Sequence, residues 1–238
     1  GSYISFANCG LPYYIGDVIK KKEDLVLQTP ESFKERFNVD VRILSEATAI
    51  DPNAKIVTIK DWRSGDTYQE SYDKLVLSPG AEPVRPALGA AESQRIFTLR
   101  NIPDTYKIKD FITMNEPKSA IVIGGGYIGL EMAENLSHAG LFVTLLQRSN
   151  QVLRNTLDFD MACDVHNELY AKGVDLNFNQ TIKSYAEEND QVIVTTESDQ
   201  FTADMLLISV GVSPESTLAK NCGVNVNERG YIVTNDRM

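Results

Sequence analysis

The pattern of apolar and polar positions changes near residue 119, which divides the chain into two kinds of structure. Before that point, short apolar runs are separated by turn-forming residues at 51–53 (Asp-Pro-Asn) and 64–66 (Ser-Gly-Asp). Strands this short and this closely spaced pair as antiparallel hairpins. Residues 79–96, which are rich in proline, alanine and glycine, are predicted to be a connector. The predicted strands are 39–50, 55–60, 67–71 and 74–78, and the predicted helices are 31–37 and 103–115.

From residue 119 onward, strand-like and helix-like segments alternate. Each predicted helix is followed by a glycine, Gly140 or Gly173, as helix C-termini commonly are. This alternation predicts a parallel sheet, so the fold class is α/β with a Rossmann-like dinucleotide-binding domain. The predicted strands are 120–123, 142–146, 174–178, 191–195 and 205–210, and the predicted helices are 127–139 and 159–172.

A glycine-rich motif, Gly-Gly-Gly-Tyr-Ile-Gly at 124–129, joins the first of these strands to the helix that follows. This is the context in which a G-x-G-x-x-G motif binds a dinucleotide. Gly124 permits the tight turn, Gly126 leaves room for a pyrophosphate beside the backbone, and Gly129 lets helix and strand pack closely. The alternative is a glycine turn that binds nothing. The predicted cofactor contacts of the motif are Gly124, Gly126, Tyr127, Ile128 and Gly129.

The end of the second strand indicates which coenzyme is bound. NAD-binding domains place Asp or Glu there, where the carboxylate accepts a hydrogen bond from the ribose 2′-hydroxyl. This chain has Gln147, followed by Arg148 and Ser149. Because a guanidinium and a hydroxyl attract a 2′-phosphate that a carboxylate would repel, Gln147 and Arg148 favour NADPH over NADH. The alternative is that Arg148 is an ordinary surface residue and that both coenzymes are used.

Composition narrows the class of partner. The 238 residues carry a formal net charge of −10, which argues against nucleic acid, whose phosphates require clustered Lys and Arg. The sequence shows neither an apolar segment of membrane-spanning length nor a signal segment. Because its three cysteines cannot all pair, a reducing, cytoplasmic setting is expected. Three widely spaced cysteines fit no zinc template, and His138 and His166 lack partners at metal spacing. No metal is therefore predicted.

Cys9 is the candidate for thiol chemistry. A lone cysteine is most often a small buried side chain. Its surroundings, Ser-Phe-Ala-Asn-Cys-Gly-Leu-Pro-Tyr-Tyr-Ile-Gly at 5–16, resemble the active-site segment of single-cysteine, FAD-dependent pyridine nucleotide-disulfide oxidoreductases. Coenzyme A disulfide reductases, NADH-dependent persulfide reductases, and NADH oxidases and peroxidases belong to this family, and the segment is most similar to the first two. The resemblance implies that Cys9 is the redox residue and that Ser5 and Asn8 hold the CoA end of the substrate.

The resemblance covers the whole chain and implies two domains and two cofactors. Residues 1–117 resemble part of an FAD-binding domain with an antiparallel β-meander, and residues 118–238 resemble the NAD(P)-binding domain. Tyr127 matches the aromatic residue that covers the flavin when nicotinamide is absent, and Glu131 matches a helix glutamate near the nicotinamide–flavin contact. The remaining implied cofactor residues are Ser78, Gly80 and Arg100 near FAD, and Gly211 at the end of the NAD(P) domain.

One position separates this chain from two-cysteine members of the family. Their C-x4-C pair would need a second cysteine five residues after Cys9, where this chain has Tyr14. The thiol is therefore expected to cycle through a mixed disulfide with CoA, a persulfide or a sulfenic acid. The first two species correspond to a reductase, and the third corresponds to an NADH oxidase or peroxidase. A further alternative is a structural Cys9, as in flavin reductases that pass electrons to a partner protein.

The resemblance also implies segments that these 238 residues do not contain. The family has a G-x-G-x-x-G motif for FAD ahead of its cysteine, and a C-terminal dimerisation domain after the NAD(P) domain. The whole enzyme is therefore expected to be a homodimer. The chain is expected to be a fragment that holds FAD poorly, lacks catalytic activity and keeps the nucleotide site.

Overall fold

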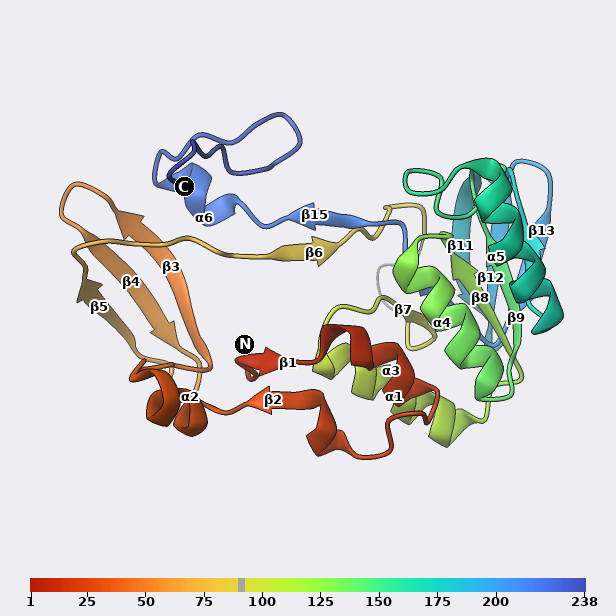
Figure 1. The fold of residues 1–238 in the computed structure, drawn as a ribbon, viewed down its shortest axis with the longest axis horizontal. Helices are drawn as coiled ribbons and strands as arrows, with labels where there is room; N and C mark the ends of the chain where they lie inside the picture. The colour runs from red at the N-terminus through yellow and green to blue at the C-terminus, as the bar shows by residue number, and fades with distance from the viewer. Residues whose placement is uncertain (90–92) are drawn as a thin grey trace. The chain divides into compact units, whose positions relative to one another are not determined.

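The computed structural model divides the chain into two compact units, each assembled from segments that are far apart in sequence (Figure 1). The cysteine segment and the glycine motif belong to the same unit. The residues that the structure describes are 1–89 and 93–238. Unit 1 comprises Gly1–Phe6, Val26–Glu82 and Val212–Met238, and unit 2 comprises Ala7–Leu25 and Pro83–Gly211.

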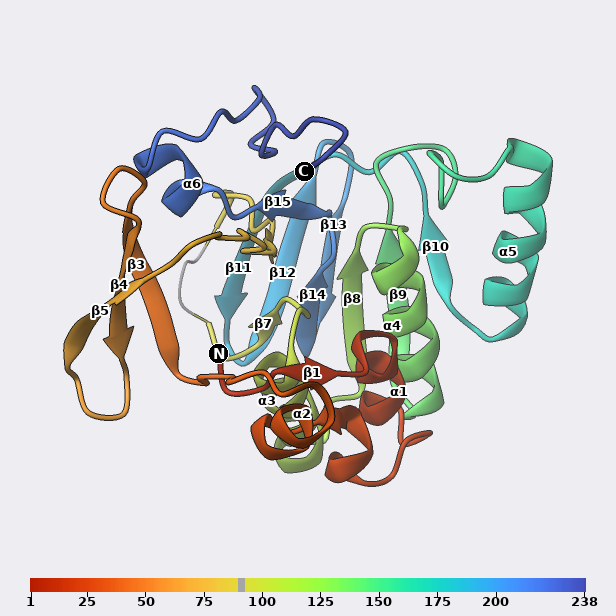
Figure 2. The same ribbon diagram turned by 60° about the vertical axis from the view of Figure 1, so that its left-hand side comes forward.

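Unit 2 is built on a sheet of five parallel strands (Figure 2). In spatial order they are β10 (Asp175–Asn177), β9 (Phe142–Leu146), β8 (Ser119–Ile123), β14 (Met205–Ile208) and β7 (Ile96–Phe97). All four residues of β14 are buried, as are four of the five residues of β8, which is expected for parallel strands covered on both faces. Helix α4 (Tyr127–His138) packs on β8 and β9, and α5 (Phe159–Ala171) packs on β10.

An antiparallel sheet completes the core of unit 2. Its strands are β11 (Ile182–Glu188), β12 (Gln191–Thr196) and β13 (Gln200–Ala203). Side chains of the two sheets form one buried apolar cluster, because strands from both contribute to it. Its members include Ile96, Ile121, Tyr185, Val192, Val194 and Leu206.

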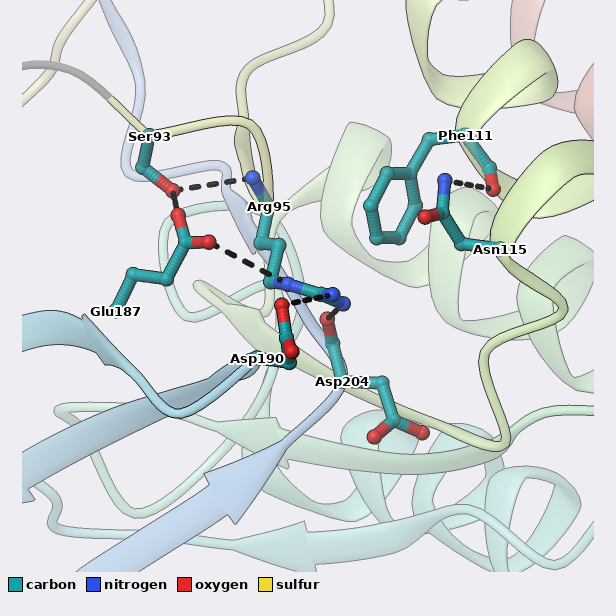
Figure 3. Close-up of polar contacts among 7 residues, drawn as sticks. All are labelled: Ser93, Arg95, Phe111, Asn115, Glu187, Asp190 and Asp204. Atoms are coloured by element: carbon teal, nitrogen blue, oxygen red, sulfur yellow. Dashed lines mark hydrogen bonds and ion pairs between the residues drawn. The ribbon is translucent and has the colours of Figure 1, made fainter.

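A polar cluster around Arg95 holds together the turns at one edge of these sheets (Figure 3). This Arg95 cluster consists of Ser93, Arg95, Glu187, Asp190 and Asp204. The guanidinium donates to the Asp190 carboxylate at 3.0 Å and to the Asp204 carbonyl at 3.2 Å, and its Nε lies 3.4 Å from Glu187. Ser93 accepts from the Arg95 amide at 3.0 Å and donates to Glu187 at 2.5 Å. The cluster thereby joins the segment before β7 to the turns β11–β12 and β13–β14.

The cysteine segment of unit 2 is a compact helical turn. A 3-10 helix, η1 (Asn8–Gly10), leads directly into α1 (Leu11–Ile15), which begins with a proline in its first turn. Proline is favoured there because its missing N–H has no partner within the helix. Helix α1 packs on α4 and on α3 (Ile102–Asn115), and a second 3-10 helix, η2 (Lys22–Leu25), closes the segment.

Unit 1 contains an antiparallel meander of β3 (Ser45–Asp51), β4 (Ile56–Asp61) and β5 (Thr67–Ser71). Two further antiparallel pairs are β1 (Ser5–Phe6) with β2 (Val26–Gln28), and β6 (Ala81–Pro83) with β15 (Val212–Pro214). Helix α2 (Pro30–Phe37) begins with a capping box, and α6 (Thr217–Asn221) packs on β3.

The predicted fold class is confirmed, because the chain has both the parallel sheet and the antiparallel meander. Two strand predictions are wrong. Residues 74–78 pair with no strand among the described residues, and the first meander strand begins at Ser45, since the left-handed conformation of Leu44 (φ +55°) interrupts the extended chain. The predicted connector 79–96 contains β6 and the start of β7, and its residues 90–92 lie outside the described residues.

The compact units do not follow a boundary between residues 117 and 118, because residues 7–25 and 83–117 belong to unit 2. The assignment of 1–117 to an FAD domain and 118–238 to an NAD(P) domain stays a prediction about family domains.

Candidate functional site

The glycine motif forms a tight turn between β8 and α4 that leaves no room for side chains at two positions. Gly124 has φ +106°, and a Cβ on it would lie 2.2 Å from the Ser209 carbonyl oxygen. A Cβ on Gly129 would lie 1.9 Å from the Gly124 carbonyl oxygen. A larger residue at Gly124 would strike the chain just after β14, and one at Gly129 would push α4 away from the turn that follows β8.

Gly126 provides the open side of this turn. It occupies the N-cap of α4, no side chain caps the helix there, and a Cβ on Gly126 would meet nothing within 4 Å. The first turn of α4 contains no acidic residue, and Tyr127 and Ile128 are 62% and 38% exposed. Uncapped backbone N–H groups at the positive end of a helix dipole bind anions. The turn therefore fits the pyrophosphate of a dinucleotide.

The loop after β9 is tied to the glycine turn through Gln147. The Gln147 side chain accepts a hydrogen bond from the Gly125 amide at 3.0 Å. It donates to the Ser149 hydroxyl at 2.7 Å and to the Gln151 carbonyl at 3.1 Å. Ser149 donates in turn to the Gln151 carbonyl at 2.7 Å. Gln147 and Ser149 thus direct their polar groups into the loop.

Two arginines of this loop are exposed, namely Arg148 and Arg154. Neither forms an ion pair with any residue in the part of the chain that the structure describes. Arg154 was not among the predicted cofactor residues, because the prediction was based only on the residues directly after the second strand. Its spacing of five residues from Ser149 was the available signal.

Helix α4 also carries Glu131 on the side that approaches α1. Burial raises the pKa of the Glu131 carboxyl, and the neighbouring Glu134 charge adds to this rise. The Glu131 carbonyl accepts a hydrogen bond from Asn135 at 2.8 Å, and Asn135 is 2% exposed. A Cβ on Gly16, which follows α1, would lie 2.3 Å from the Asn135 side-chain oxygen. This close approach fixes α1 directly on the dinucleotide helix.

Cys9 is exposed at the start of the cysteine segment, beside an exposed Asn8. Ser5, by contrast, lies in β1 of unit 1. Tyr14 is buried and packs edge-on against Tyr106, with ring centroids 6.0 Å apart. Burial, followed by the charges of Asp110, Asp17 and Glu23, raises the pKa of the Tyr14 phenol. The three cysteines of the chain are free thiols.

The C-terminal end of α1 is held by Lys109 of α3. Its ammonium donates to the Ile15 carbonyl at 3.0 Å and lies 2.6 Å from the Asp17 carboxylate. A cation beside the last carbonyls of a helix is favourable because the dipole is negative there. The exposed thiol therefore lies in η1, directly before a helix that is anchored to both α3 and α4.

The residues that the resemblance assigns to FAD are distributed over both units. Ser78 and Gly80 lie in unit 1, where the Gly80 carbonyl accepts from the Glu215 amide at 3.0 Å. Arg100 lies in unit 2, directly before the Asn101 cap of α3. Gly211, at φ +111°, ends unit 2, and its carbonyl accepts from the Val84 amide at 2.9 Å.

Other kinds of site are absent from the described residues. They hold no group of three or more His, Cys, Asp or Glu side chains placed to bind a metal, and none of their helices has the length and apolarity to cross a membrane. A hollow of about 520 Å³ in unit 1 is lined by charged side chains that include Glu31, Lys34 and Arg42. None of the predicted site residues lines it.

Comparisons with known proteins agree with this geometry. The sequence matches the family described as pyridine nucleotide-disulphide oxidoreductase over residues 1–238. The coenzyme A disulfide reductase of Staphylococcus haemolyticus is 37% identical over 234 residues, which is 98% of this chain and 52% of that protein. The chain thus spans about half the length of the curated relatives it matches.

Solved structures show the same fold. The crystal structure of reduced Bacillus anthracis CoADR-RHD has a TM-score of 0.92 and 45% identity, covering 97% of this chain and 41% of that one. The NAD-dependent persulfide reductase of A. fulgidus has a TM-score of 0.89 and 32% identity, with coverages of 96% and 42%.

An engineered water-forming NADPH oxidase, derived from the Lactobacillus brevis NADH oxidase and bound to NADPH, has a TM-score of 0.92 and 30% identity, with coverages of 100% and 52%. FAD and NAD(P)H are cofactors of this family. By its full-length match, its fold and its relatives, the chain belongs to the pyridine nucleotide-disulphide oxidoreductase family.

Proposed function

We propose that this chain is the NADPH-binding and thiol-bearing part of a flavin-dependent reductase that acts on a CoA disulfide or a CoA-linked persulfide. The observation that carries the proposal is that α1, which directly follows the 3-10 helix η1 that holds Cys9, packs on α4, the helix opened by the glycine motif, within one compact unit. An exposed thiol and a pyrophosphate-binding turn are thereby held at the starts of two helices that pack together.

Different residues would perform separate parts of this chemistry. Gly126 and the first turn of α4 would hold the pyrophosphate, and Tyr127 would cover the nicotinamide position until the coenzyme binds. The Cys9 thiolate attacks one sulfur of the CoA disulfide, which forms a Cys9–CoA mixed disulfide and releases one CoA thiolate. Bound FAD supplies the transfer of two electrons from the coenzyme to sulfur.

The loop after β9 supports NADPH as the coenzyme. The engineered NADPH oxidase carries five substitutions, three of which introduce an arginine, a serine directly after it, and a second arginine five positions beyond that serine. This chain has Arg148, Ser149 and Arg154 in the same order and spacing. The engineered enzyme also lost an aspartate directly before the first arginine, where this chain has Gln147. A carboxylate is thus missing and two guanidinium groups are present, as a 2′-phosphate requires.

Thiol exchange tests the role of Cys9 without any requirement for flavin. When the 238-residue protein is incubated with CoA disulfide, we expect its intact mass to increase by one CoA, with the adduct on the Cys9 peptide. The Cys9→Ser variant should show no adduct, whereas Cys163→Ser and Cys222→Ser should form it normally. An adduct that persists in Cys9→Ser would overturn the assignment of Cys9.

Titration with coenzymes tests the dinucleotide site. We expect the chain to bind NADPH more tightly than NADH, and Arg148→Ala and Arg154→Ala each to weaken NADPH binding about tenfold or more while leaving NADH binding nearly unchanged. Arg229→Ala, an exposed arginine of unit 1, is the matched control. Equal affinity for both coenzymes would contradict the NADPH assignment.

We expect the chain to bind coenzyme without turnover, because the G-x-G-x-x-G motif at 124–129 is the one nucleotide motif in its sequence. The visible spectrum of the purified protein measures this directly. Flavin absorbance together with NADPH-dependent release of CoA would contradict it. Homodimer assembly of a whole enzyme is likewise a proposal that rests on the family.

The second candidate function is an oxidase or peroxidase that uses a Cys9 sulfenic acid. It is favoured by the TM-score of 0.92 with the NADPH oxidase and by Tyr14, which leaves Cys9 without a second cysteine. Oxygen consumption by the flavin-loaded whole enzyme without a thiol substrate would establish this candidate, and strict dependence on CoA disulfide would exclude it.

A further inference from the structure

We propose that Gln147 is a positioning residue for coenzyme selectivity, which holds the arginine-bearing loop on the glycine turn and does not itself recognise the ribose. This inference rests on the proposed NADPH function. It differs from the role predicted for Gln147 from the sequence, which was a direct contact with the cofactor. The inference is based on the hydrogen bonds of the Gln147 side chain. They join the turn that would hold the pyrophosphate to the loop that bears Arg148 and Arg154.

The hydrogen bonds of Gln147 use both ends of its amide. The oxygen accepts from the Gly125 amide at 3.0 Å, and the nitrogen donates to the Ser149 hydroxyl at 2.7 Å and the Gln151 carbonyl at 3.1 Å. The acceptor and both donors of the side chain are thereby engaged. A side chain so committed has little capacity left for a ribose hydroxyl.

Glutamate could not replace this arrangement, although it has the same length. A carboxylate would still accept from the Gly125 amide, but it has no proton to donate to Gln151. Its second oxygen would face a carbonyl oxygen, and that contact is repulsive. The site therefore needs one acceptor and two donors on the same side chain, which glutamine supplies.

The same loop has two further attachments near the glycine turn. The Leu153 amide donates to the Gly125 carbonyl at 2.8 Å, so Gly125 is bonded to the loop through both of its backbone groups. A Cβ on Gly125 would lie 2.9 Å from a methyl of Val152, which shows how tightly the loop packs there. The Val152 amide donates in turn to the imidazole Nε2 of the buried His166 at 3.2 Å.

Arg148 and Arg154 flank this anchored segment and are both exposed. A flexible cation loses side-chain entropy when it binds an anion, and a mobile loop would add the cost of ordering its backbone. Because Gln147 fixes the loop in advance, only the arginine side chains have to be ordered by a 2′-phosphate. The loss of Gln147 should therefore weaken NADPH binding more than NADH binding.

The test measures the selectivity of the full 238-residue chain by calorimetric titration with NADPH and NADH, and with adenosine 2′,5′-bisphosphate and AMP as probes of the 2′-phosphate alone. In Gln147→Met, which keeps the side-chain length and loses every hydrogen bond, we expect the preference for the 2′-phosphate to fall roughly tenfold. In Gln147→Glu we expect a larger fall, because the new charge also repels the phosphate. Gln200→Met, an exposed glutamine of β13, is the matched control.

A double-variant cycle separates positioning from a general loss of structure. If Gln147 acts through the loop, Arg154→Ala should cost much less NADPH affinity in the Gln147→Met background than in the wild type. A merely structural role would lower the thermal midpoint and weaken both coenzymes equally, with additive effects, and that outcome would overturn the inference.

The two proposals fail in distinguishable ways. A wild-type chain that binds the bisphosphate no better than AMP would overturn both the NADPH assignment and the role of Gln147. A wild-type chain that prefers the bisphosphate, with a Gln147→Met variant that keeps the full preference, would overturn the role of Gln147 alone.

Discussion

The strands β14 in unit 2 and β4 in unit 1 both lie inside a sheet, but they differ in packing. Each is paired on both edges, β14 with β8 and β7, and β4 with β3 and β5. All four residues of β14 are buried, whereas no residue of β3, β4 or β5 is buried. Strand pairing on both edges therefore occurs both with and without an apolar core around the strand.

The difference shows where stability is concentrated. Each hydrogen bond between strands adds only about 1 kcal/mol or less to the free energy of unfolding, because the same groups bind water in the unfolded chain. A fully buried aliphatic side chain adds about 1.5–3 kcal/mol. Unit 2 combines both contributions and carries the candidate site, so its turns are held in place by the most densely buried part of the chain. Substitutions of matched chemistry in the two units should therefore differ in cost.

The largest expected difference is between Leu206→Ala in β14 and Ile59→Ala in β4. Leu206 is 0% exposed, so its truncation should cost about 2–5 kcal/mol of unfolding free energy, whereas half-buried Ile59 should cost about 1 kcal/mol. Urea unfolding measures both, with far-UV circular dichroism for the whole chain and Trp62 fluorescence for unit 1, which holds the chain's one tryptophan. Equal losses for the two variants would remove the distinction between the units.

Arginines provide the next comparison. Arg95 of unit 2 has a side chain 15% exposed that joins three segments, while the exposed Arg63 of unit 1 forms one ion pair among the described residues, with Asp61 at 3.4 Å. Arg95→Ala leaves Glu187 with a partly buried and uncompensated charge, so we expect a loss of about 2–4 kcal/mol. Arg63→Ala, with the same change of charge, should cost less than about 1 kcal/mol. A cost for Arg95→Ala as small as that for Arg63→Ala would show that the Arg95 cluster adds nothing to the core.

Unit 2 was also the region that the sequence predicted best. Apolar runs bounded by glycines placed β8, β9 and α4 to within a residue or two, since buried parallel strands and helix ends leave strong local signals. Residues 74–78 have an equally apolar run and form no strand, because a strand needs a partner that local sequence does not specify. The pattern of apolar residues indicates whether a segment could be buried. Whether the segment forms a strand depends on a neighbouring strand with which it can pair.

In the candidate site, too, some features could be predicted from the sequence and others could not. Glycine geometry followed from spacing alone, because only glycine fits where a Cβ would strike a backbone oxygen, as at Gly129. The inward orientation of Gln147 and the contact of His166 with the Val152 amide depend on tertiary packing, so residue type could not reveal them. Arg154 could have been predicted from the sequence only by comparison with the spacing of the introduced arginines and serine in a relative.

A smaller effect is expected from pH, through His166 in unit 2. Burial lowers the pKa of this imidazole below its ordinary value of 6.5, and its Nε2 must be unprotonated to accept from the Val152 amide. As pH falls below about 6.5, the unfolded chain takes up a proton that the folded chain refuses, so the unfolding free energy should decrease down to the lower folded pKa. Stability measured between about pH 5.5 and 7.0 tests this. His166→Gln should flatten the slope and exposed His138→Gln should retain it, and the reverse pattern would contradict the role of burial.

The smallest effect belongs to the strongest-looking ion pair of unit 1, Arg42 with Glu70 at 2.7 Å. The hydrogen bonds that the Arg42 guanidinium donates to Glu70, Tyr68 and Asp40 raise its pKa, yet the Arg42 and Glu70 side chains are 44% and 47% exposed. Water and salt screen exposed charges, so a double-variant cycle of Arg42→Ala and Glu70→Ala should give a coupling energy of about 0.2–1 kcal/mol that shrinks in 1 M salt. A salt-insensitive coupling above about 2 kcal/mol would mean that surface charge, and not burial, stabilises the meander. The two units would then differ in the kind of interaction that stabilises them, and no longer in how strongly they are stabilised.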